Sequence, residues 1–230
     1  MPTVVLSVSE LAAMTLHIPW LFIANGGMWR AIGLLRTSDG TVCPWLAPDG
    51  RWLPEDLPIL FRLYPFTVLP DEDRFRMGVW DDPDCIGEKG TNIFDGEALA
   101  PELAPVVKRL SQFTSGVAEI QKIAEALFEA GVLHPSKIGH SGQAKLFSVD
   151  ETALRELNGQ SLEALSATGA LGAAHAQLLS LRHISKLTTG AEPSVPTMPG
   201  APDAPEASFL NAVVQDLETD VAFELGLLET

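Results

Sequence analysis

Residues 101–130, PELAPVVKRLSQFTSGVAEIQKIAEALFEA, decide how this chain folds. Apolar side chains recur in this stretch at alternating spacings of four and three, which places them on one stripe of an α-helix. Pro101 suits the first turn of that helix, and Gly131 followed by Pro135 suits its end. The spacing therefore predicts one long helix over 101–130. Its core-facing stripe is expected to consist of Val106, Leu110, Phe113, Val117, Ile120, Ala124 and Leu127.

The chain before this helix is rich in short extended segments. Asn25-Gly26-Gly27 supplies residues that tolerate positive φ between two apolar runs, so the sequence predicts a β-hairpin over 20–35. Short helical stretches are expected at 9–16 and 57–63. The strands expected in this half are Thr3 to Leu6, Trp20 to Ala24, Met28 to Leu35, Phe66 to Leu69 and Phe75 to Trp80.

The chain after the long helix begins with a strand and continues as helix. Lys145 to Val149 has strand character. Ser148 and Glu151 have the spacing of a capping box, in which each side chain satisfies an unpaired backbone donor of the other. The sequence therefore predicts a helix that begins near Asp150.

Gly159 and Gly169 divide the following segment into three short helices, of which the last is expected over 170–187. Together these patterns predict an α+β fold. Its β-rich N-terminal half packs on the long helix and is followed by a small helical C-terminal part.

Charge changes abruptly near the end of the chain. Residues 1–186 hold 22 acidic and all 15 basic side chains, whereas the remaining residues hold 8 acidic and no basic side chains. Between the two regions, proline recurs at every third position, as in a polyproline II helix. We therefore expect an α+β domain over 1–187, a stiff proline-rich linker over 188–207 and an acidic amphipathic helix over 208–230. The five prolines are Pro193, Pro196, Pro199, Pro202 and Pro205.

The expected terminal helix has an apolar edge that needs a surface to cover it. Ser208 is a suitable cap, and burying each large apolar side chain is worth about 1.5–3 kcal/mol. We predict that this edge binds a partner or closes over the chain's own body. The predicted partner-binding residues are Phe209, Val213, Leu217, Val221, Leu225 and Leu228.

Composition limits the classes of partner. With 230 residues, 46% of them hydrophobic, the chain can bury the core of one domain. The formal net charge of −15 argues against binding to nucleic acid or anionic lipid, because both interactions depend on Lys and Arg. The apolar run at 17–25 is too short to span a bilayer. Residues 1–16 include Glu10 and do not resemble a signal peptide, so we expect a cytoplasmic protein whose partner is another protein.

A cluster of carboxylates is the first candidate for chemistry. Asp81, Asp82, Asp84 and Glu88 offer the ligands that hard cations prefer, but they lack the glycine and terminal glutamate of a calcium loop. A solvated loop is the simpler interpretation. Cys85 has no base beside it in sequence, which disfavours a nucleophilic role. With Cys43, it makes too few cysteines for a disulfide framework or a zinc cluster.

The histidines do not form a recognisable ligand set. His134 and His140 flank a loop and would share a metal only if that loop folded back. His175 and His183 are eight residues apart on one predicted helix, which is too far for a single ion. The sequence therefore predicts no metal and no cofactor, and it leaves the catalytic residues unknown.

Aromatic residues offer a second candidate site. All five tryptophans lie in the first 80 residues, where a β-rich half needs large apolar side chains, so core or pocket lining is the simpler interpretation. The alternative is a peptide-binding groove, because Trp and Tyr are favoured at recognition surfaces. Its candidate residues are Trp52, Arg62, Tyr64 and Phe66.

Four blocks of the chain resemble the bacterial SapC-like family. Residues 149–187 are similar to its closing segment: VDETALRELNGQSLEALSATGALGAAHAQLLSLRHISKL. Upstream, in the family's order, are 6–33 (LSVSELAAMTLHIPWLFIANGGMWRAIG), 49–66 (DGRWLPEDLPILFRLYPF) and 92–103 (NIFDGEALAPEL). An ordered series is more specific than any single motif. The segment 188–230 is not part of this pattern, so the resemblance says nothing about it.

The resemblance implies a role beside other proteins. The family is named from a surface-layer gene cluster, and its genes tend to lie near genes for flavin-dependent tryptophan-halogenase-like and cupin-like oxygenase enzymes. We therefore expect a non-enzymatic protein-binding or accessory protein that assists a peptide- or aromatic-modifying enzyme. Two alternatives remain open. One is an enzyme of such a pathway that uses the 81–88 carboxylates and a loop histidine, and the other is a structural surface-layer protein.

Overall fold

A five-stranded antiparallel sheet forms the centre of the computed structural model, which describes residues 3–36, 43–71, 74–96, 98–137 and 145–188. Three of its strands come from the start of the chain, and two come from the second half. In spatial order they are β1 (Thr3–Leu6), β3 (Met28–Leu34), β2 (Trp20–Asn25), β9 (Lys145–Val149) and β8 (Leu133–Pro135). The second half of the chain thus completes a sheet that the first half begins.

The hairpin of β2 and β3 confirms the turn predicted at residues 25–27. Asn25 pairs with Met28 at the end of the ladder, and Gly26 and Gly27 have φ values of +56° and +82°. Two consecutive residues with positive φ are what a two-residue type I′ turn requires. The sequence therefore fixes the register of the central hairpin through its two glycines.

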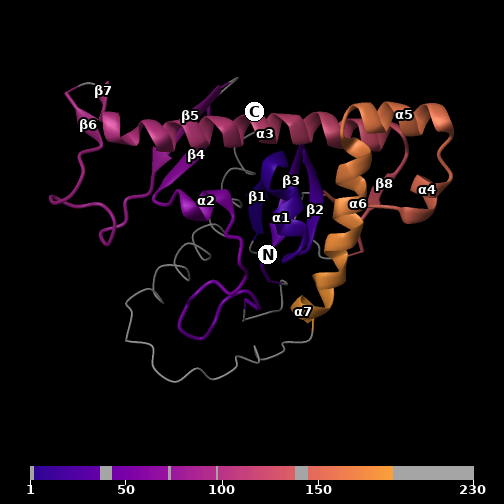
Figure 1. Cartoon of the computed structure of the whole chain (residues 1–230), viewed down its shortest axis with the longest axis horizontal. Helices are drawn as coiled ribbons and strands as arrows, with labels where there is room; N and C mark the ends of the chain where they lie inside the picture. Colours follow the sequence, from indigo (N-terminus) through magenta and orange to yellow (C-terminus); the bar gives the residue numbers. More distant parts are fainter. Residues whose placement is uncertain (1–2, 37–42, 72–73, 97, 138–144, 189–230) are drawn as a thin grey trace.

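The predicted long helix is present as η2 (Pro101–Leu103) followed by α3 (Ala104–Glu129). Its core-facing stripe is confirmed from Leu110 to Leu127, whereas Val106 is only half-buried. α3 packs on β3, and its first half continues past the sheet (Figure 1). Burial of the stripe therefore begins after the first helical turns.

Two small β-ribbons and a short helix accompany the part of α3 that extends past the sheet (Figure 1). The ribbons are β4 (Phe66–Asp71) with β5 (Arg74–Val79), and β6 (Phe94–Asp95) with β7 (Ala98–Leu99). The helix is α2 (Ile59–Arg62), in the segment where one or two helical turns are predicted. Near the start of the chain, η1 (Val8–Glu10) and α1 (Leu11–Thr15) form the other predicted short helix, and η1 packs on α3.

The C-terminal part of the described chain is helical, as predicted. Gly169 has a φ value of +74° and separates two of the helices, which confirms its role as a divider. The elements are α4 (Glu151–Arg155), α5 (Gly159–Ala167), α6 (Ala170–Ser180), η3 (Leu181–His183) and α7 (Ile184–Thr188). The fold is therefore α+β, with the sheet packed on α3 and a helical part at the end.

The capping box predicted between Ser148 and Glu151 is wrong, although the helix begins where expected. The cap is Asp150, whose side chain accepts hydrogen bonds from the backbone N–H groups of Thr152 and Ala153. Ser148 still belongs to β9, where it pairs with His134 of β8. Its backbone pairs within the strand, two residues before the cap Asp150, so Ser148 does not serve as the cap.

A buried polar seam attaches α6 to the sheet where β2 and β9 stop pairing. Gln177 bridges the two strands: its Oε1 accepts from Val149 N–H at 3.2 Å, and its Nε2 donates to Trp20 C=O at 3.2 Å. Ser180 Oγ accepts from Trp20 N–H at 3.2 Å, and Trp20 Nε1 donates to Thr15 Oγ1 at 3.0 Å. These side chains are buried, and the polar groups named here have partners. The seam is therefore a structural connection between α1, the sheet and α6.

Across the ranges given above, no helix combines the length and the apolar character needed to cross a bilayer.

Candidate functional site

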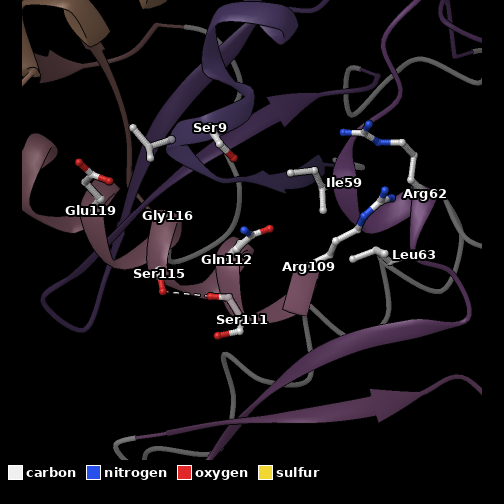
Figure 2. A pocket seen from close by; sticks show the side chains of 11 residues that line it. Ser9, Ile59, Arg62, Leu63, Arg109, Ser111, Gln112, Ser115, Gly116 and Glu119 are labelled. Carbon is white, nitrogen blue, oxygen red and sulfur yellow. Dashed lines mark hydrogen bonds between the residues drawn. The ribbon is translucent and has the colours of Figure 1, made fainter. Parts of the chain in front are cut away.

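A cleft of about 590 Å³ lies between η1, α2 and α3 (Figure 2). Its volume falls within the range of roughly 300–1,000 Å³ that is typical of ligand pockets. The wall combines apolar, hydroxyl, amide and charged side chains, a mixture that suits a ligand with both polar and apolar groups. The lining residues are Val8, Ser9, Ile59, Arg62, Leu63, Arg109, Ser111, Gln112, Ser115, Gly116 and Glu119.

Helix α3 supplies one wall of the cleft through a second stripe beside its buried one. Arg109, Gln112, Gly116 and Glu119 are spaced by three, four and three residues, which places them on one face of the helix. Ser115 Oγ donates to the carbonyl of Ser111 at 3.0 Å, so this hydroxyl is held against the helix backbone. The stripe presents polar groups toward η1 and α2.

Gly116 allows η1 to approach α3 closely. A Cβ at this position would lie 2.5 Å from Ser7 Oγ, closer than such atoms pack. Ser7 is itself fixed, because it forms a capping box with Glu10: Ser9 N–H donates to Ser7 Oγ at 3.3 Å, and Ser7 N–H donates to Glu10 Oε2 at 3.0 Å. The floor of the cleft therefore depends on a glycine opposite a capped turn.

Glu10 ties η1 to α2 behind the cleft. Its side chain is buried, and its second oxygen, Oε1, accepts from the backbone N–H of Ile59 at 2.7 Å. Burial raises the pKa of Glu10, while the hydrogen bonds from Ser7 and Ile59 and the positive charge of Arg62 act to lower it. One carboxylate thus sets the distance between two walls of the cleft.

Arg62 and Arg109 give one end of the cleft a positive charge. Figure 2 shows the two arginines at one end and Glu119, the acidic residue of the lining, at the other. Neither arginine forms an ion pair with a carboxylate of the described residues. A guanidinium offers a planar fork of donors that matches a carboxylate. In a chain with a net charge of −15, this end of the cleft is a local reversal of sign that fits an anionic group.

Comparison with known protein families identifies the chain. The SapC family model matches residues 1–187. The chain belongs to the SapC family. The match ends before the acidic segment 208–230, in agreement with the resemblance noted from the sequence. Searches of curated proteins and of solved structures find no match.

Of the four groove residues predicted from the sequence of this SapC protein, Arg62 lines the cleft and the other three are placed elsewhere. Trp52 packs edge-on against Phe61, with ring centroids 5.9 Å apart, and its Nε1 donates to Asp56 C=O at 2.9 Å. Tyr64 donates its hydroxyl to Asp82, and Phe66 opens β4 by pairing with Val79. The structure therefore brings Arg62 together with Arg109 rather than with the predicted aromatic residues.

The carboxylates at 81–88 form an ordinary turn around Asp82. Asp82 Oδ1 accepts from Asp84 N–H at 2.9 Å, and Oδ2 accepts from the Tyr64 hydroxyl. The bond from Tyr64 holds the pKa of Asp82 below its usual value. Among the residues that the structure describes, no group of three or more His, Cys, Asp or Glu side chains is arranged to hold a metal ion.

The described histidines have separate partners, and His17 lies 3.2 Å from Asp56 Oδ2. His134 is in β8, and its Nδ1 lies 3.5 Å from Asp150 Oδ2. β8 lies near one end of α3, and the 81–88 segment lies toward the other end (Figure 1). His175 is exposed, and one ring nitrogen lies 3.0 Å from Leu171 C=O. His183 is buried against Trp45. His140 lies outside the described residues.

The predicted linker, apart from Thr188 at its start, and the predicted terminal helix also lie outside the described residues. The positions concerned include all six predicted partner-binding residues: Phe209, Val213, Leu217, Val221, Leu225 and Leu228. Their role stays a prediction.

Arg109, Gln112 and Glu119 line the cleft but were not predicted from the sequence. Their three-and-four spacing was visible beside the apolar stripe and showed that they share a face of the helix. What the spacing does not show is which elements face that stripe. Only the folded chain reveals that η1 and α2 enclose it and that Arg62 lies beside Arg109.

Proposed function

We propose that this SapC-family chain is a non-enzymatic, cytoplasmic accessory protein that binds another protein. The cleft receives an acidic segment of that partner, and the partner is an enzyme that modifies peptides or aromatic compounds. The observation that carries the proposal is the pair Arg62 and Arg109, which line a cleft of about 590 Å³. Among the described residues neither has a carboxylate within ion-pair distance, and Arg62 acts on buried Glu10 only through its charge.

The lining of the cleft favours a peptide segment over an isolated anion. Val8, Ile59 and Leu63 provide an apolar wall, while the arginines provide forked donors for a carboxylate. A segment that combines an acidic and an apolar side chain would use both surfaces. Gln112, with a side-chain amide, can donate to or accept from the segment's backbone.

The terminal segment 208–230 provides the second contact in this proposal. Its six apolar positions, Phe209, Val213, Leu217, Val221, Leu225 and Leu228, are spaced as the edge of a helix that lies in a partner's groove. The proline-rich segment before it connects that edge to the body. The partner is thus bound at two places on the chain.

Site-specific photo-crosslinking in cells of the source organism tests the proposal. Gln112 is replaced by p-benzoylphenylalanine in the full-length chain, and adducts are identified by mass spectrometry. We expect one dominant partner protein. Each charge-assisted hydrogen bond contributes about 1.5–3 kcal/mol, so replacing Arg62 and Arg109 by Gln should lower the yield at least about tenfold. The same crosslinker at Glu163, exposed on α5, is the matched control.

A yield that does not change when both arginines are replaced would contradict the proposal. So would the same set of adducts from position 112 and position 163, because a cleft-specific partner cannot react equally at both sites. An adduct that forms with free amino acids or small metabolites instead of a protein would also refute a protein-binding role.

A further inference from the structure

We infer that the cleft is occupied, before a partner binds, by the chain's own acidic terminal segment, residues 208–230. This inference rests on the proposed function, because the terminal segment and the partner would bind in the same cleft and displace each other. The segment acts as an internal mimic of the acidic ligand.

Charge complementarity carries the first step. The 44 residues after Lys186 hold 8 acidic and no basic side chains, and the rest of the chain has a net charge of −7. Most of the body therefore repels the segment. At physiological ionic strength the Debye length is about 8 Å, so nearby charges dominate over the net charge of the body. A local positive site such as Arg62 with Arg109 is where an acidic segment binds favourably.

The chemistry of the segment matches both surfaces of the cleft. Asp216 and Asp220 are four residues apart, so on a helix they point the same way, and Leu217 and Val221 repeat the pattern on the adjacent edge. Carboxylates of this pair face the arginines while the apolar pair faces Val8, Ile59 and Leu63. A cleft of about 590 Å³ accepts only part of such a helix, so we place residues 216–221 in it.

The linker is long enough to bring the segment to the cleft. The run from Pro193 to Pro205 extends about 40 Å at a rise of roughly 3.1 Å per residue. A compact body of about 190 residues has a radius of gyration of about 16 Å, which corresponds to a diameter of about 40 Å. In Figure 1, α7 and α2 lie on the same side of α3. The end of α7 and one wall of the cleft thus lie on the same side of α3 in this view.

Occupancy of the cleft has a functional consequence. The apolar edge of the segment is partly covered while it lies in the cleft, and the arginines are neutralised. A partner with a competing acidic segment displaces the terminal segment from the arginines and so exposes its apolar edge. The chain thus limits nonspecific contacts of its own apolar edge until the correct partner is present.

Distance measurement in the full-length chain tests the inference. Spin labels are attached at Ala118→Cys, an exposed position of α3 next in sequence to the cleft residue Glu119, and at Thr219→Cys. Cys85→Ser removes the exposed native thiol, and Cys43 is buried and stays unlabelled. Pulsed dipolar spectroscopy should show a defined short-distance component.

Matched variants decide what causes that component. We expect it to fall at least threefold in a tail variant and in an Arg62→Gln, Arg109→Gln variant. It should persist in a control that removes the same number of charges from exposed body positions. The tail variant carries Asp216→Asn, Glu218→Gln and Asp220→Asn, and the control carries Glu129→Gln, Glu156→Gln and Glu163→Gln.

Three results would overturn the inference. The first is a distance distribution that is equally broad in the parent and in the tail variant. The second is loss of the component in the control as well. The third is a dipolar signal between two singly labelled chains that have been mixed, which would place the segment in the cleft of a second copy. The crosslinking at position 112 reports separately on the partner, so an empty cleft that still captures a partner refutes this inference and leaves the proposed function standing.

Discussion

The polar seam under α6 and the cleft beside α3 use similar side chains in opposite ways. In the seam, Gln177 and Ser180 are buried, and the amide and hydroxyl groups bond to the backbone of neighbouring strands. In the cleft, Gln112 and the two arginines are exposed to a cavity and have no comparable bonds among the described residues. Satisfied polar groups hold a fold together, whereas polar groups that face an open cavity are available to a ligand.

This contrast separates stability from binding within one chain. Changes in the seam should lower the free energy of unfolding, because they leave buried backbone groups without partners. Changes at the open end of the cleft should alter binding and leave the fold nearly as stable. A change at Gly116, in the floor of the cleft, should affect both the stability of the fold and the shape of the binding site.

Replacing Gln177 by Leu should have the largest effect on stability. The substitution leaves Val149 N–H and Trp20 C=O buried without partners, and each such group costs about 1–3 kcal/mol. We expect the free energy of unfolding, measured by urea denaturation, to fall by about 3 kcal/mol. Gln112→Leu is the matched control and should change it by less than about 0.5 kcal/mol. Equal effects of the two substitutions would contradict the distinction between seam and cleft.

Replacing Gly116 by Ala should have the next largest effect. The new Cβ would lie 2.5 Å from Ser7 Oγ, so η1 or α3 has to shift, and overpacking of this kind costs about 1–3 kcal/mol. Gly172→Ala, in α6, is the control: a Cβ there meets no atom within 4 Å, and Ala is the better helix former. It should stabilise the protein by up to about 1 kcal/mol. The idea fails if both variants unfold at the same urea concentration.

The sequence predicted where the long helix and the central strands lie better than it predicted which elements pack against one another. The periodicity of α3 and the two glycines after Asn25 carry local signals, so the long helix and the central hairpin were predictable. The two-residue strands β6 and β7 and the three-residue β8 are too short to show a period, and they were not predicted. Ser148 was predicted as a cap although it lies within the predicted strand Lys145 to Val149, and the observed cap is the next polar residue, Asp150.

The candidate site was harder to predict for the same reason. Arg62 was predicted because it lies near Tyr64 and Phe66 in sequence, but Tyr64 donates to Asp82 and Phe66 pairs with Val79. Its actual neighbour in the cleft, Arg109, is 47 residues away in sequence. Glu10, which fixes the distance between η1 and α2, was identified only as an argument against a signal peptide. Long-range contacts of single charged side chains leave no periodic trace in a sequence.

Acidification should weaken the packing of His183 in η3 against Trp45. Burial lowers the pKa of His183 from its ordinary value of 6.5, aided by the charges of Lys186 and Arg182 and opposed by backbone hydrogen bonds with Thr15 and Leu16. The folded state therefore favours the neutral ring, and the unfolded state binds the proton more readily. Stability should be complete above about pH 6.5 and should fall as the pH drops below it. His183→Gln should flatten this part of a pH series of urea denaturation curves, and an unchanged slope would show that another group is responsible.

The smallest effect on stability should come from the arginines, and the two should differ. Arg109→Gln removes an exposed charge with no ion-pair partner among the described residues, so the free energy of unfolding should change by less than about 0.5 kcal/mol. Arg62→Gln also removes a charge that lowers the pKa of Glu10, and that pKa is already raised by burial. A carboxyl with a raised pKa in the folded state favours folding in its protonated form, so stability declines as the pH rises above about 4.5. Arg62→Gln should make this decline larger, whereas Arg109→Gln should not. Urea denaturation between pH 4 and pH 8 measures the difference, and identical pH profiles for the two variants would show that Arg62 does not act on Glu10.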